Sequence, residues 1–182
     1  MIATMNTSAT TLEWRAIAAL EPRFELGDGD EVTASLAFDA PATTRARAET
    51  REGSWTFERP GLLSATVHVR EADSDQDLAL FHPGLLGPGH LRFGNGVTFS
   101  WHHHGPGMGT WSFRGEGGEA LVILRRTELP GRGPQAPEAL VEIPPAGRFL
   151  PRVPLLATLG WYLILLHQWD GAAEDPGGLQ GL

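Results

Sequence analysis

Apolar and polar residues alternate along most of the chain, from residue 12 to about residue 143. The segment 32–38 is typical, because apolar side chains stand at every second position and face one way. A period of two predicts β-strands with one buried face. Turn residues such as Gly94-Asn95-Gly96 separate these segments. The pattern therefore predicts about twelve short antiparallel strands.

The stretch Leu155–Leu166 breaks this pattern, since it is apolar at almost every position and carries no charge. A surface helix has one apolar stripe and one polar face, so a helix here must be surrounded by protein or by lipid. Pro154 suits a first helical turn, and Asp170-Gly171 provides a stop signal. We therefore expect a helix over about 154–169, roughly 24 Å long at 1.5 Å per residue.

The length of the apolar run decides whether protein or lipid surrounds the helix. The run holds 12 residues, whereas spanning the ~30 Å hydrocarbon core of a bilayer takes about 20. Arg152 and Asp170 limit its extension on the two sides. A helix inside the protein, and a chain that does not span a membrane, are therefore predicted. A tail-anchored membrane protein that uses 155–166 as its anchor is the alternative.

About twelve antiparallel strands are more than an open twisted sheet holds comfortably, so we expect the sheet to close. A barrel of this size leaves room on its axis for one helix of about 10 Å diameter. The predicted fold is mainly β: a closed antiparallel barrel of about twelve strands around a buried hydrophobic C-terminal helix. One domain covers 1–170, and 171–182 forms a flexible tail. Small residues are expected to face the helix, at Ala34, Ala46, Ala48 and Ala65.

Three helix residues have expected roles in such a barrel. Gly160 lets a side chain of the wall approach closely, and Trp161 fills the bore. The hydroxyl of Tyr162 needs a hydrogen-bond partner from the wall or from a trapped water.

Composition narrows the functional classes. The chain has 182 residues and a formal net charge of −8, which argues against a general nucleic-acid binder. It has no cysteine, which excludes a disulfide framework, a thiolate metal site and a cysteine nucleophile. All 14 basic residues are arginine, and 23 Gly and 14 Pro accompany them, a composition typical of a GC-rich bacterial genome. The N-terminus has no secretory pattern, so a cytoplasmic location is expected.

Two Trp-x-Phe pairs, Trp55-Phe57 and Trp111-Phe113, stand in the strand region, and the uniformly apolar C-terminal helix follows it. This plan resembles the Tubby C-terminal-like superfamily, which includes the phospholipid scramblases and the plant LURP-one-related proteins. The resemblance is one of overall architecture and covers nearly the whole chain. It implies a twelve-stranded barrel around a buried helix. The phosphoinositide-binding basic positions of Tubby have no identifiable counterparts in this sequence, so headgroup binding is not carried over.

The run 102–104 is a candidate metal site. On a continuing strand, His102 and His104 project together from the polar face with Ser100. Two imidazoles at this spacing can share a metal ion, and His68 or His90 is a candidate to complete the site. The alternative is an exposed strand end with the intervening histidine facing the core.

The segment 71–77 is a second candidate metal site. Asp73, Asp75 and Asp77 supply carboxylate oxygens at alternate positions, as the start of a calcium loop does. Leu78 stands where an EF-hand needs glycine, and Gly84 where it needs glutamate. An acidic hairpin loop is the alternative.

The segment 45–51 is a basic stripe on an acidic protein. Arg45, Arg47 and Arg51 can meet a phosphate headgroup through bidentate contacts. Glu49 and Glu52 interrupt the stripe, so a solvated face or a ladder of ion pairs is the favoured alternative.

The sequence contains no nucleophile elbow, P-loop, dinucleotide fingerprint or zinc-protease motif. We therefore predict a non-catalytic cytoplasmic binding or scaffold module of Tubby-like type, without a cofactor. A protein or a lipid headgroup is the candidate partner. The alternatives are the tail-anchored membrane protein and an enzyme or metal-binding protein that uses His102 and His104.

Overall fold

A computed structural model describes residues 9–17, 22–40, 43–61, 64–85, 87–105, 109–127 and 138–174. Within these residues the chain forms twelve strands followed by one helix, α1. The strands are β1 (Thr10–Ala16), β2 (Arg23–Asp28), β3 (Glu31–Phe38), β4 (Ala46–Thr50), β5 (Ser54–Glu58), β6 (Val67–Glu71), β7 (Asp77–His82), β8 (Gly89–Phe93), β9 (Thr98–His104), β10 (Thr110–Arg114), β11 (Ala120–Arg126) and β12 (Ala139–Ile143).

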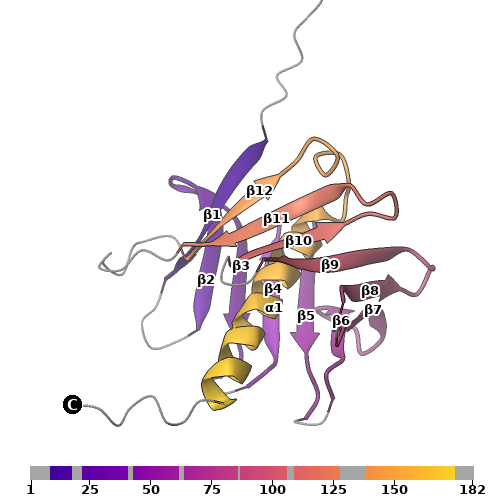
Figure 1. The fold of residues 1–182 in the computed structure, drawn as a ribbon. Helices are drawn as coiled ribbons and strands as arrows, with labels where there is room; N and C mark the ends of the chain where they lie inside the picture. Colours follow the sequence, from indigo (N-terminus) through magenta and orange to yellow (C-terminus); the bar gives the residue numbers. More distant parts are fainter. Residues whose placement is uncertain are drawn as a thin grey trace, which may run out of the picture.

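The twelve strands form one closed antiparallel barrel, in which each strand pairs with its neighbours in sequence (Figure 1). The barrel closes between β1 and β12, where Thr10 lies opposite Ile143 and Trp14 opposite Ala139. Alternation along the strands places one set of side chains in the interior. In β3, for example, Ala34, Leu36 and Phe38 are buried. The predicted fold class is confirmed.

Helix α1 (Val153–Glu174) runs through the barrel (Figure 1). Every side chain from Leu155 to Leu166 is buried, which explains why this stretch is apolar on all sides. No helix of the described residues is long and apolar enough to cross a membrane.

The helix is longer than the 154–169 expected from the sequence. It continues through Asp170 and Gly171, where a stop was expected, to Glu174. Asp170 binds the barrel wall through its side chain, and a single glycine costs a helix only about 1 kcal/mol relative to alanine. The first four residues of the expected tail 171–182 are thus helical, and 175–182 lie outside the described residues.

Two of the expected helix–wall contacts are present. A Cβ added to Gly160 would come within 2.8 Å of Leu124 Cδ1 and 3.3 Å of the Trp101 ring, so only glycine allows this approach. The hydroxyl of Tyr162 donates a hydrogen bond of 2.6 Å to the carbonyl oxygen of Thr44. Helix and wall are therefore joined by close packing and by a buried hydrogen bond.

Trp161 fills the other side of the bore. Its ring stacks on Trp14 with 6.1 Å between centroids, and Phe24 meets its ring edge-on at 5.6 Å. Aromatic pairs at these separations add to the stabilisation from burial.

The helix backbone lies close to two groups of strands, β3–β5 and β10–β11, which are separated around the barrel. The strands β6–β9, between these groups, and β12, β1 and β2 stand further from the helix backbone. Ala34, Ala46 and Ala48 are buried on β3 and β4, two of the near strands, as expected from their size. The expectation for Ala65 is wrong: it precedes β6 and is exposed, because the strand that buries its inward residues begins only at residue 67.

Candidate functional site

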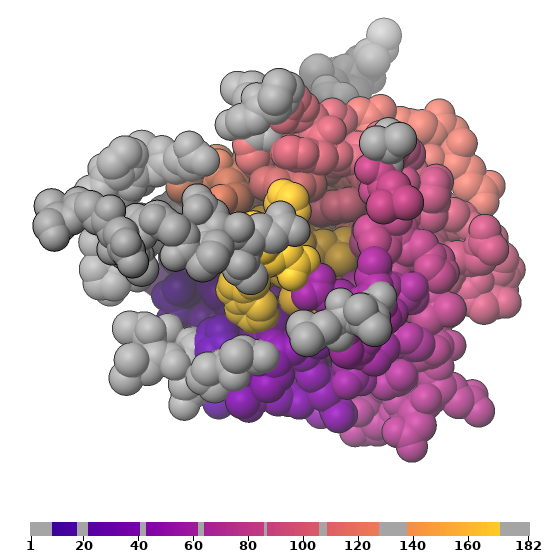
Figure 2. Space-filling view, turned by 60° about the horizontal axis from the view of Figure 1, so that its bottom comes forward, coloured from indigo at the N-terminus to yellow at the C-terminus, as the bar shows by residue number. Residues whose placement is uncertain are grey.

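A cavity of about 310 Å³ opens beside the C-terminal half of α1, between the helix and the strands that stand away from it. We call it the mouth cavity. Figure 2 looks at this end of the barrel and shows the surface hollowed beside the helix. Its wall includes six large apolar side chains: Val67, Phe81, Trp101, Trp111, Leu163 and Leu166. The cavity therefore lies between the helix and the arc of strands β6–β9 that the helix backbone does not approach.

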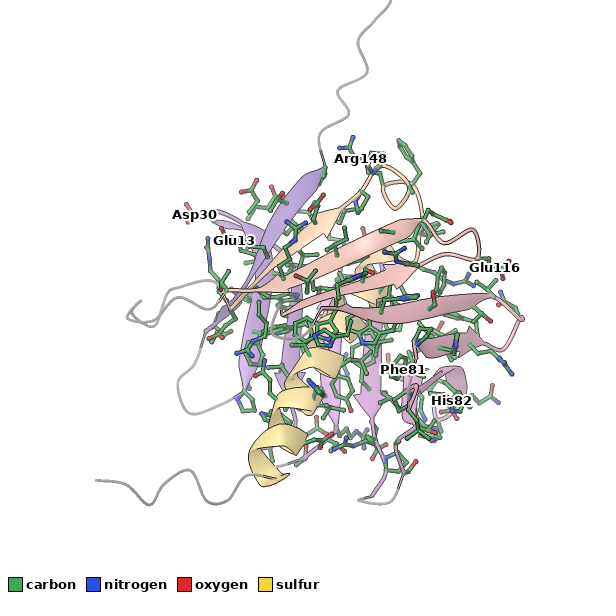
Figure 3. The ribbon with its side chains drawn as sticks, viewed as in Figure 1. Glu13, Asp30, Phe81, His82, Glu116 and Arg148 are labelled. Carbon is green, nitrogen blue, oxygen red and sulfur yellow. The ribbon has the colours of Figure 1, made fainter. Side chains whose placement is uncertain are left out.

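Two glycine–aromatic contacts shape the cavity wall. A Cβ on Gly89 would lie 2.6 Å from Phe81 Cζ, so this glycine lets the tip of the Phe81 ring approach β8 closely. Phe81 is buried, while its neighbour His82 is exposed on the outer face (Figure 3). Just before β10, a Cβ on Gly109 would lie 3.2 Å from the Trp111 ring. Glycines thus let two aromatic rings of the wall lie close to the backbone.

An ion pair closes one side of the mouth cavity. Arg59, which follows β5, donates hydrogen bonds from Nη1 and Nη2 to the two carboxylate oxygens of Asp170 on α1, at 2.6 and 2.8 Å. The hydrogen bond from Arg59 holds the pKa of Asp170 below its usual value. The carboxylate is therefore ionised and fully engaged.

Two imidazoles flank the cavity on the other side. His103 stacks on Trp111 with 4.8 Å between ring centroids, and its ring lies 6.4 Å from that of His167 on α1. Both histidines line the cavity and are exposed. Each can present an N–H donor to a molecule in the cavity.

Arg126 stands at the same end of the barrel. It lies two residues beyond Leu124, which contacts the helix, so alternation places both on the inner face of β11. Its Cβ lies 3.0 Å from the Cβ position of Gly109, which also adjoins the Trp111 ring. Among the described residues Arg126 has no carboxylate partner, whereas its outward neighbour Arg125 pairs with Glu142 at 3.2 Å.

The sequence did not single out these polar residues. Arg59 and Asp170 are 111 positions apart and belong to no motif. One signal was present: His103 and Arg126 are both in phase with the apolar residues of their strands, unlike His102 and Arg125.

His102 and His104 lie together on the outer face, as predicted. Their rings are stacked with 6.3 Å between centroids, and their Nε2 atoms lie 3.0 Å from Ser100 Oγ and 2.8 Å from Ser112 Oγ. Burial, and then the charge of a nearby arginine, lowers the pKa of both. No group of three or more His, Asp or Glu side chains suited to a metal occurs in the described part of the chain. Metal binding by this pair stays a prediction.

The acidic segment 73–77 does not bring its carboxylates to one point. Asp77 Oδ1 accepts a hydrogen bond of 2.8 Å from Arg70, and its Oδ2 lies 2.8 Å from His68 Nδ1. Partial burial raises the pKa of Asp77, but these hydrogen bonds outweigh that effect and lower it. Asp73 and Asp75 are exposed in the preceding turn. His68 is therefore engaged here and not beside His102, and divalent binding by the segment stays a prediction.

Each arginine of the basic stripe, Arg45, Arg47 and Arg51, forms an ion pair. These arginines lie 3.3, 2.9 and 2.9 Å from carboxylate oxygens of Asp39, Glu49 and Glu31, respectively. All three pairs are exposed, so each contributes little stability. The arrangement is that of the ion-pair ladder, and headgroup binding by the stripe stays a prediction.

No family model, curated protein or solved structure matches this chain. The barrel plan, the mouth cavity and the side chains around it are thus the features from which a function can be inferred.

Proposed function

We propose that this chain is a non-catalytic cytoplasmic binding module of Tubby-like type, and that the mouth cavity is its ligand site. One observation carries the proposal: the helix occupies the barrel interior but leaves a cavity of about 310 Å³ at one end. Cavities of this size, with apolar walls and a few polar groups, are typical small-molecule sites.

The architecture supports the Tubby-like part of the proposal. A closed antiparallel barrel of twelve strands with one C-terminal helix is the plan that the resemblance implies. In this chain the helix residues Gly160 and Tyr162 are fitted to the wall by a close approach and a hydrogen bond. The helix is therefore a fixed part of the core and leaves the barrel end for binding.

The side chains of the cavity favour binding over catalysis. Both oxygens of Asp170 are occupied by Arg59, and its pKa is lowered, so it is poorly suited to accept or donate a proton. The ring of His103 is held by its stack on Trp111, and no carboxylate in the part of the chain that the structure describes orients it as a general base. The absence of cysteine fits a reducing compartment, which is why we place the module in the cytoplasm.

A fragment screen by ligand-observed NMR tests the proposal. The variant Ala65→Trp places an indole at the cavity edge from an exposed position, so it should block the cavity without disturbing the core. The matched control is Gln76→Trp, which adds the same side chain at an exposed turn between β6 and β7.

We expect fragments that bind the wild-type protein to lose binding in Ala65→Trp and to keep it in Gln76→Trp. Equal binding by both variants, or no fragment binding at all, would show that the mouth cavity is not a ligand site. If the protein turns over a bound compound, and this turnover is lost when His103 is replaced, the protein is an enzyme and not a binding module.

A further inference from the structure

We propose that the mouth cavity binds a small carboxylate with an aromatic body. This inference rests on the proposed function, because it assigns a chemical class to the ligand of the same cavity. Three features carry it: the apolar side chains of the wall, a cationic side chain near the cavity that has no carboxylate partner among the described residues, and two imidazole N–H donors at the rim.

The walls suit a planar apolar group. Phe81 and Trp101 present rings to the cavity from β7 and β9, and Leu163 and Leu166 close it from α1. At about 310 Å³ the cavity has the volume of a small-molecule site and not of a long acyl chain's tunnel. Burying an aromatic ring there removes a large apolar surface from water, which supplies most of the binding free energy.

The charges at the rim favour an anion. Arg59 and Asp170 neutralise each other through two hydrogen bonds. That pair leaves Arg126, a partly buried residue on the inner face of β11 without a carboxylate partner in the described part of the chain. Arg126 does not itself line the cavity, but its Cβ lies at Gly109, beside the Trp111 ring of the cavity wall. Glu138, before the adjacent β12, is exposed and out of phase with the buried Ala139, so it belongs to the outer face. A chain of net charge −8 therefore carries a local positive site at this end.

The histidines complete an anchor for a carboxylate. His103 and His167 lie near each other at the cavity, with 6.4 Å between their ring centroids, and Trp111 connects His103 to the neighbourhood of Arg126. A carboxylate has two oxygens and accepts several hydrogen bonds, which one guanidinium and two imidazole N–H groups can supply. The aromatic body would then occupy the apolar part of the cavity, and the charge would stay at the rim.

A cationic ligand fits this cavity less well. Asp170 is already fully engaged by Arg59. One face of the Trp111 ring, which could attract a cation, is also covered by the stacked His103 ring.

Isothermal titration with three indoles tests the charge preference directly. Indole-3-acetate, indole-3-acetamide and tryptamine share one ring system and carry a negative, a zero and a positive charge near neutral pH. We expect the carboxylate to bind about tenfold more tightly than the amide, as charge-assisted hydrogen bonds predict. The amine should bind most weakly of the three.

The variant Arg126→Gln assigns the effect to one side chain. It should weaken indole-3-acetate binding by about tenfold and leave indole-3-acetamide nearly unchanged. Arg125→Gln is the matched control, because it removes the same charge one residue away on the outer face. If both variants weaken indole-3-acetate binding equally, the preference for the carboxylate reflects only the net charge of the protein. The assignment to Arg126 is then wrong.

The outcomes separate this inference from the proposed function. If the amide or the amine binds as well as the acid and Ala65→Trp abolishes that binding, the cavity is a ligand site but the anion assignment is wrong. If none of the indoles binds while other fragments do, the assignment is again wrong. If no fragment binds the cavity, the proposed function fails together with the inference.

Discussion

Replacing Tyr162 by Phe should change how the stability of the barrel depends on alkaline pH. Tyr162 is the single tyrosine of the chain, which also has no lysine and no cysteine. Arginine titrates only above about pH 12, and an α-amino group near pH 8. Between roughly pH 9 and pH 11 the Tyr162 phenol is thus the one side chain of the sequence that is expected to titrate.

The direction follows from the environment of the phenol. Its side chain is fully buried between Phe38 and Phe57, and burial raises its pKa well above the usual value. In the unfolded chain the phenol loses its proton near its ordinary pKa of about 10. Above that pH the unfolded state releases a proton that the folded state keeps, so folding stability is complete below about pH 10 and falls as the pH rises towards the folded pKa.

The magnitude can be worked out from the unfolded pKa alone. At about pH 11, one unit above this pKa, deprotonation of the phenol lowers the free energy of the unfolded state by RT ln 11. The free energy of unfolding is therefore about 1.4 kcal/mol smaller than at neutral pH. At neutral pH, Tyr162→Phe loses the hydrogen bond to the Thr44 carbonyl without leaving a cavity, which costs about 1 kcal/mol. The stabilities of wild type and variant should therefore converge with rising pH and cross near about pH 10.6.

Urea unfolding of both proteins at several pH values from neutral to alkaline measures this effect. The free energy of unfolding of the wild type should fall above about pH 10, while that of Tyr162→Phe stays flat. Parallel curves for the two proteins would refute the reasoning. So would a phenolate absorbance that appears in the folded wild type near the ordinary pKa of tyrosine.

Other changes test the helix and the histidine pair. Leu159→Asp should unfold the whole protein, because it buries an unpaired charge in the core, and circular dichroism and gel filtration would detect the loss of the barrel. Gly171→Ala should stabilise the protein by up to about 1 kcal/mol, since the position is helical, exposed and open. Gly160→Ala should be clearly less favourable than Gly171→Ala in urea unfolding, because its Cβ would meet a buried wall side chain at 2.8 Å. Zn²⁺ near the protein concentration should raise the melting temperature very little, and a larger shift that disappears in His102→Ala, His104→Ala would establish a metal site.

These tests have clear contrary results. A folded Leu159→Asp protein would mean that the helix is not part of the core. Equal gains from alanine at Gly160 and Gly171 would mean that the wall does not restrict the helix at its midpoint. For the zinc test, the zinc-induced change in melting temperature of the His102→Ala, His104→Ala variant serves as the baseline for unspecific binding.

The sequence alone determined the elements and the burial of the helix. Strands follow from alternation because side chains on a strand point to opposite faces, whatever the neighbouring strands are. The burial of Leu155–Leu166 follows from its composition, because no polar face remains for water. The need of Tyr162 for a partner was equally local, although the partner Thr44, 118 positions away, was not.

The tertiary structure alone decided the candidate site. Alternation places His103 and Arg126 on the inner faces of their strands, but it does not say which inward residues meet at one end of the barrel. The pair of Arg59 and Asp170, and the extension of the helix beyond it, depend on where the helix lies within the closed sheet. That position is set by the combined shapes of the side chains from many strands, since Gly160 approaches one wall while Trp161 fills the opposite side. A cavity is the space that such packing leaves, and packing at long sequence separation is not encoded in any local pattern.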